Sequence, residues 1–355
     1  MNDTNLTDSL CDEASELAHS ETMKIVLIIQ AIGCFSCFIT MPIIFKKRGI
    51  RWLVHHNTRL LFAFHIGFTC LANAVYLFIH IYDLVRYWSS SDDPCSYLMT
   101  FVFVFHVRII AIFGIFGQIY TIFSIAIERL YSTYYPVEYE RTSSYKLGIG
   151  LLSGSILLAF CFSYGLLAPG SEWDHEVVAF TVRDNNNEDR YQTMMYAEVI
   201  PEVIVFFLFH FVLYVNHLKS PISTLLSLSN RYQIEENKKV IITLLPIFYI
   251  HFVFFFITSF GLSLFYVIFP SGSKVVHTMF LEIVCIIPIY GTVMPIVLEI
   301  ALRIRTKQIE VIRKTEEGEM YFSTLNDTWN NSPPAEQRTI TSRSKVNFLS
   351  VNKKS

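Results

Sequence analysis

Charged residues are scarce in this chain of 355 residues, of which only 16% are Asp, Glu, Lys or Arg. Soluble domains have about 25% of these residues. Hydrophobic residues make up 52% of the chain. An ordinary water-soluble domain is therefore excluded, because much of the surface must face something other than water.

The sequence also lacks the motifs that carry enzymatic or metal chemistry. None of its seven cysteines has the spacing of a zinc or iron–sulfur site. Gly-x-Ser-x-Gly, His-x-x-Glu-His and phosphate-binding glycine loops are absent. We therefore expect no enzyme, no cofactor and no bound metal, and no nucleic acid among the partners.

Seven long apolar segments are present instead. Hydrocarbon offers no water to backbone N–H and C=O groups, so a segment that crosses a bilayer is expected to be helical. The sequence therefore predicts an all-α membrane protein, a bundle of seven transmembrane helices in a lipid bilayer. The predicted segments are residues 23–45, 60–82, 97–131, 147–168, 196–216, 240–269 and 275–302.

The basic residues are distributed unevenly between the two sides of the predicted bundle. The N-terminal tail and the second, fourth and sixth connections hold 4 Lys and Arg, against 22 in the other three connections and the C-terminal tail. Basic connections stay cytoplasmic, which predicts the N-terminus outside and the C-terminus in the cytoplasm. The expected parts are an extracellular tail (1–22), the seven-helix domain (23–302), a membrane-surface helix (303–314) and a disordered cytoplasmic tail (315–355).

The N-terminal tail carries signs of an extracellular location. It is acidic and polar, so no cleavable signal peptide is expected and the first apolar segment should direct insertion. Asn2 and Asn5 begin glycosylation sequons. Cys11 and Cys95 lie outside the apolar segments on the side expected to be oxidising, which predicts a disulfide between them. Two free thiols are the alternative.

Several ionisable residues fall in the predicted outer halves of the helices. Arg108 follows the predicted start of the third helix by about twelve residues, which places it ~18 Å deep. A charge at this depth is expected to face the bundle interior and to have a partner. A polar cluster lining a ligand cavity and a structural ion pair both explain such residues. The candidates for a ligand pocket are Arg108, Glu202, Glu282, His106 and Glu198.

At the predicted inner end of the third helix, Glu128 and Arg129 are adjacent. This acid and base can pair with each other or with a neighbouring helix, or they can expose Arg129 to a cytoplasmic partner. The pair is therefore a candidate for an inner switch with two states. An interfacial charge pair whose arginine reaches toward water is the alternative.

Three stretches carry a resemblance to a known family. They are Ile127-Glu128-Arg129-Leu130-Tyr131 with the Tyr135-Pro136 segment after it, the polar run from Leu228 to Asn237, and Pro288, Tyr290 and Pro295 in the seventh segment. With them the chain resembles the rhodopsin-type G protein-coupled receptors. It is more closely similar to the nematode serpentine chemoreceptors of classes alpha, beta, alpha/beta and epsilon, with class alpha/beta the most similar.

The resemblance implies a function and a location. It implies a chemosensory receptor in a sensory-neuron membrane that binds an external small molecule or peptide and signals through a heterotrimeric G protein. Arg231 and Tyr232 would then contact the G protein beside Glu128 and Arg129. A seven-helix ligand-gated channel and a small-solute transporter are the alternatives. The expected orientation opposes a channel of the insect odorant-receptor kind, and the absence of buried charges near the inner face opposes a transporter.

Overall fold

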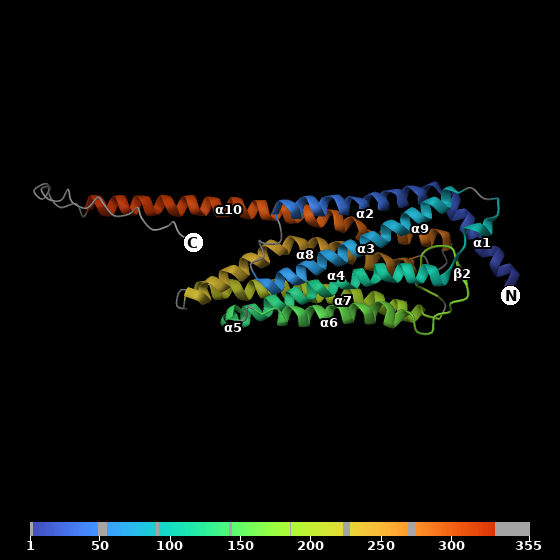
Figure 1. Ribbon diagram of the computed structural model, residues 1–355, viewed down its shortest axis with the longest axis horizontal. Coiled ribbons are helices and arrows are strands. Elements are labelled where there is room, and N and C mark those ends of the chain that lie inside the picture. The colour runs from blue at the N-terminus through green and yellow to red at the C-terminus, as the bar shows by residue number, and fades with distance from the viewer. Residues whose placement is uncertain are drawn as a thin grey trace, which may run out of the picture. The chain divides into compact units, whose positions relative to one another are not determined.

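The computed structural model describes residues 3–48, 55–89, 92–141, 144–184, 186–222, 228–268 and 274–330. The chain forms two units, residues 1–302 and 303–355. In the described residues seven helical stretches are long and apolar enough to cross a membrane, as predicted. They run side by side in the first unit (Figure 1).

The helices and the two short strands follow one another along the chain. One end of the bundle carries α1 and the β-strands and is called the α1 end below, and the opposite end carries α5 and is called the α5 end (Figure 1). The elements are α1 (Asp3–His19), α2 (Glu21–Arg48), α3 (His56–Trp88), the 3₁₀ turn η1 (Pro94–Tyr97), β1 (Met99–Thr100), α4 (Phe101–Tyr134), α5 (Pro136–Arg141), α6 (Lys146–Phe160), the π turn η2 (Cys161–Gly165), β2 (Glu176–Val177), α7 (Glu188–Ile222), α8 (Leu228–Ile268), α9 (Lys274–Val284) and α10 (Ile287–Asn330).

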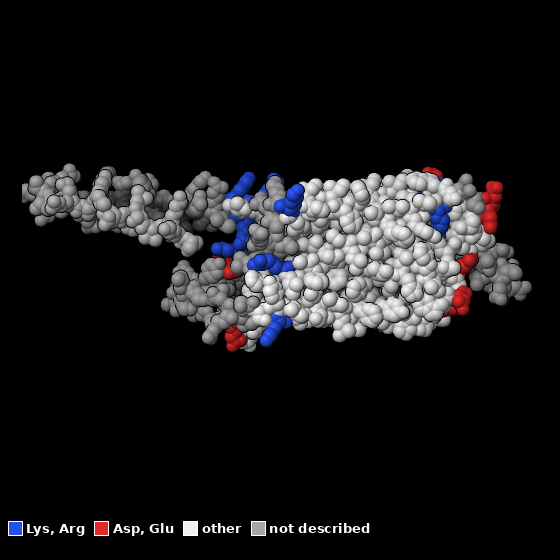
Figure 2. All heavy atoms as spheres, in the orientation of Figure 1, with Lys and Arg blue, Asp and Glu red and all other residues white. Residues whose placement is uncertain are grey.

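Charge separates the two ends of the bundle from its middle. On the face shown in Figure 2, a broad band without Asp, Glu, Lys or Arg lies between the two ends. Most visible Lys and Arg lie at the α5 end, and most visible acidic residues lie at the α1 end. Large hydrophobic side chains point outward from the helices, including Ile32, Leu157 and Phe207, which are 61–65% exposed. These exposed apolar side chains form a surface suited to contact with lipid acyl chains.

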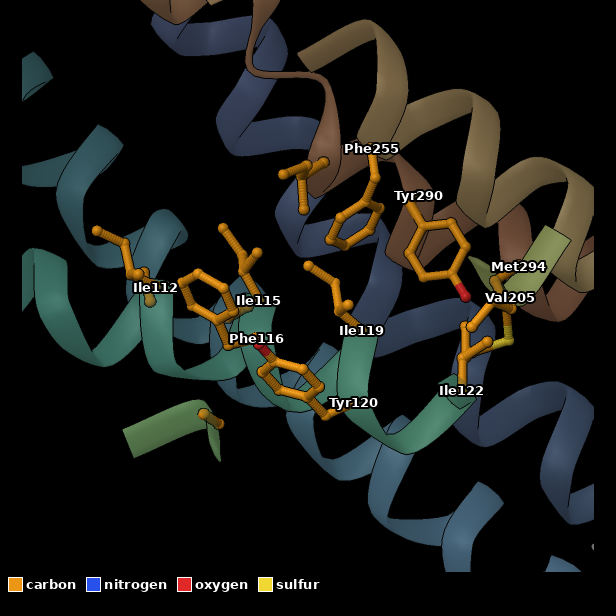
Figure 3. Packing of buried hydrophobic residues seen from close by; sticks show 14 of the residues in the cluster. Ile112, Ile115, Phe116, Ile119, Tyr120, Ile122, Val205, Phe255, Tyr290 and Met294 are labelled. Carbon is orange, nitrogen blue, oxygen red and sulfur yellow. The ribbon is translucent and has the colours of Figure 1, made fainter. Parts of the chain in front are cut away.

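Helix α4 forms the centre of the packing. Figure 3 shows Ile115, Phe116 and Ile119 of α4 pointing toward the same interior as Phe255 of α8 and Tyr290 of α10. Each of these five side chains is at most 3% exposed. Of the seven candidate membrane spans, that of α4 has the largest buried share.

Close approach of α3 and α4 depends on a glycine. A Cβ atom on Gly117 would lie 2.4 Å from the nearest ring carbons of Phe68. Small residues at such positions allow membrane helices to approach closely. Gly117 therefore leaves the space that the Phe68 ring fills.

The seventh predicted segment is broken between α9 and α10. The break precedes Pro288, which has no backbone N–H to donate to an earlier turn. The side chain of Gln30, from α2, donates to the carbonyl oxygens of Glu282 and Cys285 at 3.1 and 3.0 Å. A buried glutamine thus satisfies carbonyl groups at the break.

The N-terminal segment is helical. Helix α1 contacts η1, and a disulfide joins Cys11 of α1 to Cys95 of η1, the pair expected from the sequence. Ala14 and Leu17 are buried and pack in one cluster with Tyr97 and residues of α2, α3 and α9. Helix α1 therefore covers part of the α1 end of the bundle.

The C-terminal prediction needs correction. Helix α10 continues without interruption to Asn330, so residues 303–314 are not a separate helix and residues 315–330 are helical, where disorder was expected. The stretch contains several Glu, Lys and Arg, which favour helices, and no proline follows Pro295 until Pro333. Residues 331–355 lie outside the described part of the chain.

Candidate functional site

The position of Arg108 depends on where α4 begins. Residues 94–100 form η1 and β1, and β1 pairs in antiparallel register with β2, so that Met99 faces Val177. Helix α4 therefore begins at Phe101 and not near Tyr97. Arg108 lies about 10 Å along the helix, which is shallower than the ~18 Å expected from hydropathy.

Arg108 is half-buried on α4, over the ring of Tyr76. The Arg108 guanidinium carbon lies 4.8 Å from the centre of the Tyr76 ring, and Arg108 interacts electrostatically with Glu282 of α9. Glu282 is buried, and its Oε2 lies 3.9 Å from Nδ1 of His80. Neither of these two atoms has a hydrogen-bond partner in the described residues.

Glu198 and Glu202 share the face of α7 that packs on α8. The Ser259 hydroxyl donates to Glu198 Oε2 at 3.0 Å. Glu202 Oε1 lies 3.0 Å from Nδ1 of His251, and both side chains are buried. The remaining candidate, His106, is exposed on α4, where its Nδ1 bonds the carbonyl oxygen of Val102, so it is not part of the interior cluster.

The sequence prediction missed three buried polar residues that extend this cluster toward the centre. They are His65, His251 and Tyr290. His65 Nε2 lies 2.8 Å from the Tyr290 hydroxyl, and His65 Nδ1 lies 3.3 Å from Thr121 Oγ1. The ring centres of His251 and Tyr290 are 5.0 Å apart. Glu202, His251, Tyr290 and His65 thus connect α7, α8, α10 and α3. Single histidines in apolar helices are the sequence signal that could have indicated them.

The second cluster lies at the α5 end around Glu128 and Arg129. Arg129 donates through Nε and Nη2 to the two carboxylate oxygens of Glu128, both at 2.6 Å. Its Nη2 also donates to Thr58 Oγ1 and to the Tyr139 hydroxyl, both at 2.7 Å. Tyr139 and Thr58 in turn donate to the Glu128 carboxylate. Glu128 and Arg129 are 0% and 2% exposed, so this is a buried, hydrogen-bonded ion pair rather than a solvated one.

The network continues from Arg129 to the sixth membrane-spanning helix, α8. Arg129 Nη1 donates to Asn237 Oδ1 at 3.1 Å. Asn237 Nδ2 donates to Thr133 Oγ1 at 2.5 Å, and Asn216 of α7 donates to the same oxygen at 2.8 Å. Lys219 of α7 donates to the Thr133 carbonyl oxygen at 2.8 Å. The α5 ends of α4, α7 and α8 are therefore held together by polar contacts.

His55, immediately before α3, closes one side of this network. Its ring stacks on Tyr139 with centres 3.8 Å apart, and its Nδ1 lies 3.7 Å from Glu128 Oε1. Burial and then the positive charge of Arg129 lower the pKa of His55 to about 3. The imidazole is therefore neutral at neutral pH.

Some predicted residues cannot be assigned a contact. Asn2 lies outside the described residues. Asn5, Arg231 and Tyr232 lie in helices α1 and α8, but their side chains are outside the described part of the structure. Within the described residues no group of three or more His, Cys, Asp or Glu side chains could hold a metal ion.

Sequence comparison identifies the family. The model of the family described as serpentine type 7TM GPCR receptor class ab chemoreceptor matches residues 8–330. The chain belongs to this family. The predicted family and its class alpha/beta are thereby confirmed, and the seven candidate spans fit a multi-pass membrane protein.

Two similar proteins are known individually. Serpentine receptor class alpha-10 of Caenorhabditis elegans is 25% identical over 144 residues, 41% of this chain and 40% of that protein. Serpentine receptor class alpha-10 of Caenorhabditis briggsae is 24% identical over 164 residues, 45% of this chain and 47% of that protein. The matches span less than half the length of these relatives.

Proposed function

We propose that this receptor binds an external small molecule or peptide at the α1 end and signals through a heterotrimeric G protein at the α5 end. In this proposal the α1 end lies outside the cell and the α5 end lies in the cytoplasm, in the membrane of a sensory neuron. The distribution of Lys and Arg supports the orientation. The observation that carries the proposal is the buried network that joins Arg129 to Asn237.

The network holds α4 and α8 together at the proposed cytoplasmic end. Moving α8 away from α4 requires the hydrogen bond between Arg129 and Asn237 to break. Separation of the two helices would release the guanidinium group for a cytoplasmic partner. The structure thus has the features of a resting state in which Arg129 is occupied within the bundle.

The ligand site proposed at the α1 end contains two groups of ionisable residues, of which all but the half-buried Arg108 are buried. Arg108 and Glu282 form one, and Glu198 and Glu202 with His251 form the other. A ligand activates the receptor only if it binds the active arrangement more tightly than the resting one. The contacts from Glu202 through His251 to Tyr290 offer a route by which a ligand could alter the central packing.

The proposed topology makes Asn2 and Asn5 available for glycosylation and places the Cys11–Cys95 disulfide in an oxidising compartment. Digestion with an N-glycosidase tests the topology directly. A mobility shift that disappears in the Asn5→Gln variant supports the orientation. If an epitope at the N-terminus became accessible only after intact cells were permeabilised, the orientation would be the reverse of the one proposed.

Expression in cells with a panel of G proteins tests the coupling. A panel of small molecules and peptides is applied, and second messengers are measured together with surface expression. We expect a response that Arg129→Ala abolishes at equal surface level, because the guanidinium is the proposed G-protein contact. Arg108→Gln should shift ligand potency. A ligand-gated current that persists without G proteins would overturn the proposal in favour of a channel.

A further inference from the structure

Helices α3 and α6 both begin at the α5 end of the bundle, and their first turns are in direct contact. Helix α3 begins at His56 and α6 begins at Lys146. The backbone N–H of Gly148 in α6 donates to Asn57 Oδ1 in α3 at 3.2 Å. A Cβ atom on Gly148 would lie only 2.8 Å from that oxygen, so the two helices approach closely here. The side chains that flank this contact are therefore held near one another.

Basic and aromatic side chains around the contact form one connected group. The ring of His56 stacks on the ring of Tyr145, with centres 5.3 Å apart. Arg59 Nη2 lies 3.3 Å from His56 Nδ1. A guanidinium group can only donate, so Nδ1 accepts and the hydrogen of the neutral imidazole is on Nε2. His56 thus presents an N–H donor between the cationic side chains of Arg59 and Lys146, the residue that follows Tyr145.

This group lies at the boundary between the charged α5 end and the apolar middle of the bundle, the two regions visible in Figure 2. His56, Tyr145 and Lys146 are exposed. Farther along the same two helices, Phe64 is 40% exposed and Ile149 is 54% exposed. Tyrosine and lysine side chains at such a boundary reach the level of the lipid headgroups. A ligand that contacts both surfaces therefore has an anionic head and an apolar tail.

We propose that His56, Arg59, Tyr145 and Lys146 bind the phosphate headgroup of an anionic phospholipid, whose acyl chain lies along the exposed apolar residues of α3 and α6. Arg59 and Lys146 supply positive charge, and His56 Nε2 donates to a phosphate oxygen. A zwitterionic phospholipid has the same phosphate but carries its own positive charge, so it binds more weakly. In the proposed orientation the site faces the cytoplasmic leaflet, where anionic lipids are concentrated. Binding does not depend on G-protein coupling.

Photolabelling of the purified full-length protein in nanodiscs locates the site. The probe is phosphatidylserine with a diazirine near the start of one acyl chain, in a background of phosphatidylcholine, and labelled residues are identified by mass spectrometry. We expect saturable labelling of residues 56–64 and 145–149 that excess plain phosphatidylserine suppresses. Phosphatidylcholine with the same diazirine should label these residues several-fold less. Equal labelling by the two lipids, or labelling that does not saturate, would overturn the proposal.

Substitution of an exposed lysine tests whether the cationic group holds the headgroup. Lys146→Gln should raise the phosphatidylserine concentration that half-suppresses labelling by about five-fold, whereas Lys146→Arg should not. Lys239→Gln is the matched control, because it removes the same charge from an exposed position on α8, and it should behave as the wild type. Equal concentrations for Lys146→Gln and Lys239→Gln would contradict the proposal. So would suppression by soluble glycerophosphoserine as effective as that by the lipid, because the occupant would then be a free phosphate compound.

Discussion

Asn237→Leu removes the side-chain hydrogen bonds between α8 and α4 with the least other change. The leucine side chain has nearly the same shape as asparagine but neither donates nor accepts. It removes the 3.1 Å bond from Arg129 and the 2.5 Å bond to Thr133. The hydrogen bonds between Arg129 and Glu128 remain. The perturbation therefore acts on the contact between the helices and not on the ion pair.

The size of the effect follows from the charge on Arg129. A hydrogen bond to a charged group contributes about 1.5–3 kcal/mol. If the resting state has this bond and the active state does not, its loss shifts the equilibrium toward the active state by roughly 10- to 150-fold. Asn237 is 2% exposed, so water does not readily replace the lost acceptor. We therefore expect ligand-independent activity to rise by at least ten-fold.

The assay is nucleotide exchange on purified heterotrimeric G protein without ligand, at matched receptor amounts. Thr40→Val is the control, because the Thr40 hydroxyl donates within α2 to the carbonyl oxygen of Ser36 at 3.0 Å. The control should show the basal activity of the wild type. Unchanged basal exchange by a folded Asn237→Leu receptor would refute the role assigned to this bond.

Three further predictions concern stability. Gly117→Ala should destabilise the protein by about 1–3 kcal/mol because the added carbon overpacks against the Phe68 ring of α3. Gly154→Ala is the control and should not destabilise it, because nothing lies within 4 Å of the added carbon. Thermal unfolding in detergent distinguishes the two variants. Cys11→Ser removes the disulfide and should lower the free energy of unfolding by about 2–4 kcal/mol. Cys161→Ser changes an exposed free thiol and should unfold like the wild type under non-reducing conditions. Because burial lowers the pKa of His55 to about 3, the unfolded chain binds more protons between that pH and ~6.5. Acidification from pH 7 to 5 should therefore lower the unfolding temperature, and less so in His55→Gln; equal pH dependence would refute this.

The membrane-spanning part of the fold was predictable because the bilayer imposes a simple rule on sequence. A segment must be apolar for about 20 residues and must satisfy its own backbone, so hydropathy alone locates the helices. The pairing of Cys11 with Cys95 was equally accessible, since these two cysteines alone lie outside the apolar segments. The candidate pair of Glu128 and Arg129 was also predictable, because the two residues are adjacent in the sequence.

The depth of Arg108 and the central histidine cluster were not predictable in the same way. Hydropathy does not report that residues before Phe101 form a turn and a strand, because Tyr97 and Met99 are as apolar as the helix that follows. His65 and His251 are far apart in sequence, and only the packing of α3 and α8 brings their ring centres within 5.5 Å. Asn237 was likewise indistinguishable from other polar residues of its segment until the structure placed it beside Arg129.

The distance between α4 and α8 at the α5 end tests the central claim most directly. Spin labels at Tyr134 and Lys239, both exposed, report it by pulsed electron paramagnetic resonance, with the exposed Cys161 replaced by serine. Addition of nucleotide-free heterotrimeric G protein should lengthen the distance by several ångströms, and Asn237→Leu should populate the longer distance without it. Binding of the G protein with no change in this distance would contradict the account.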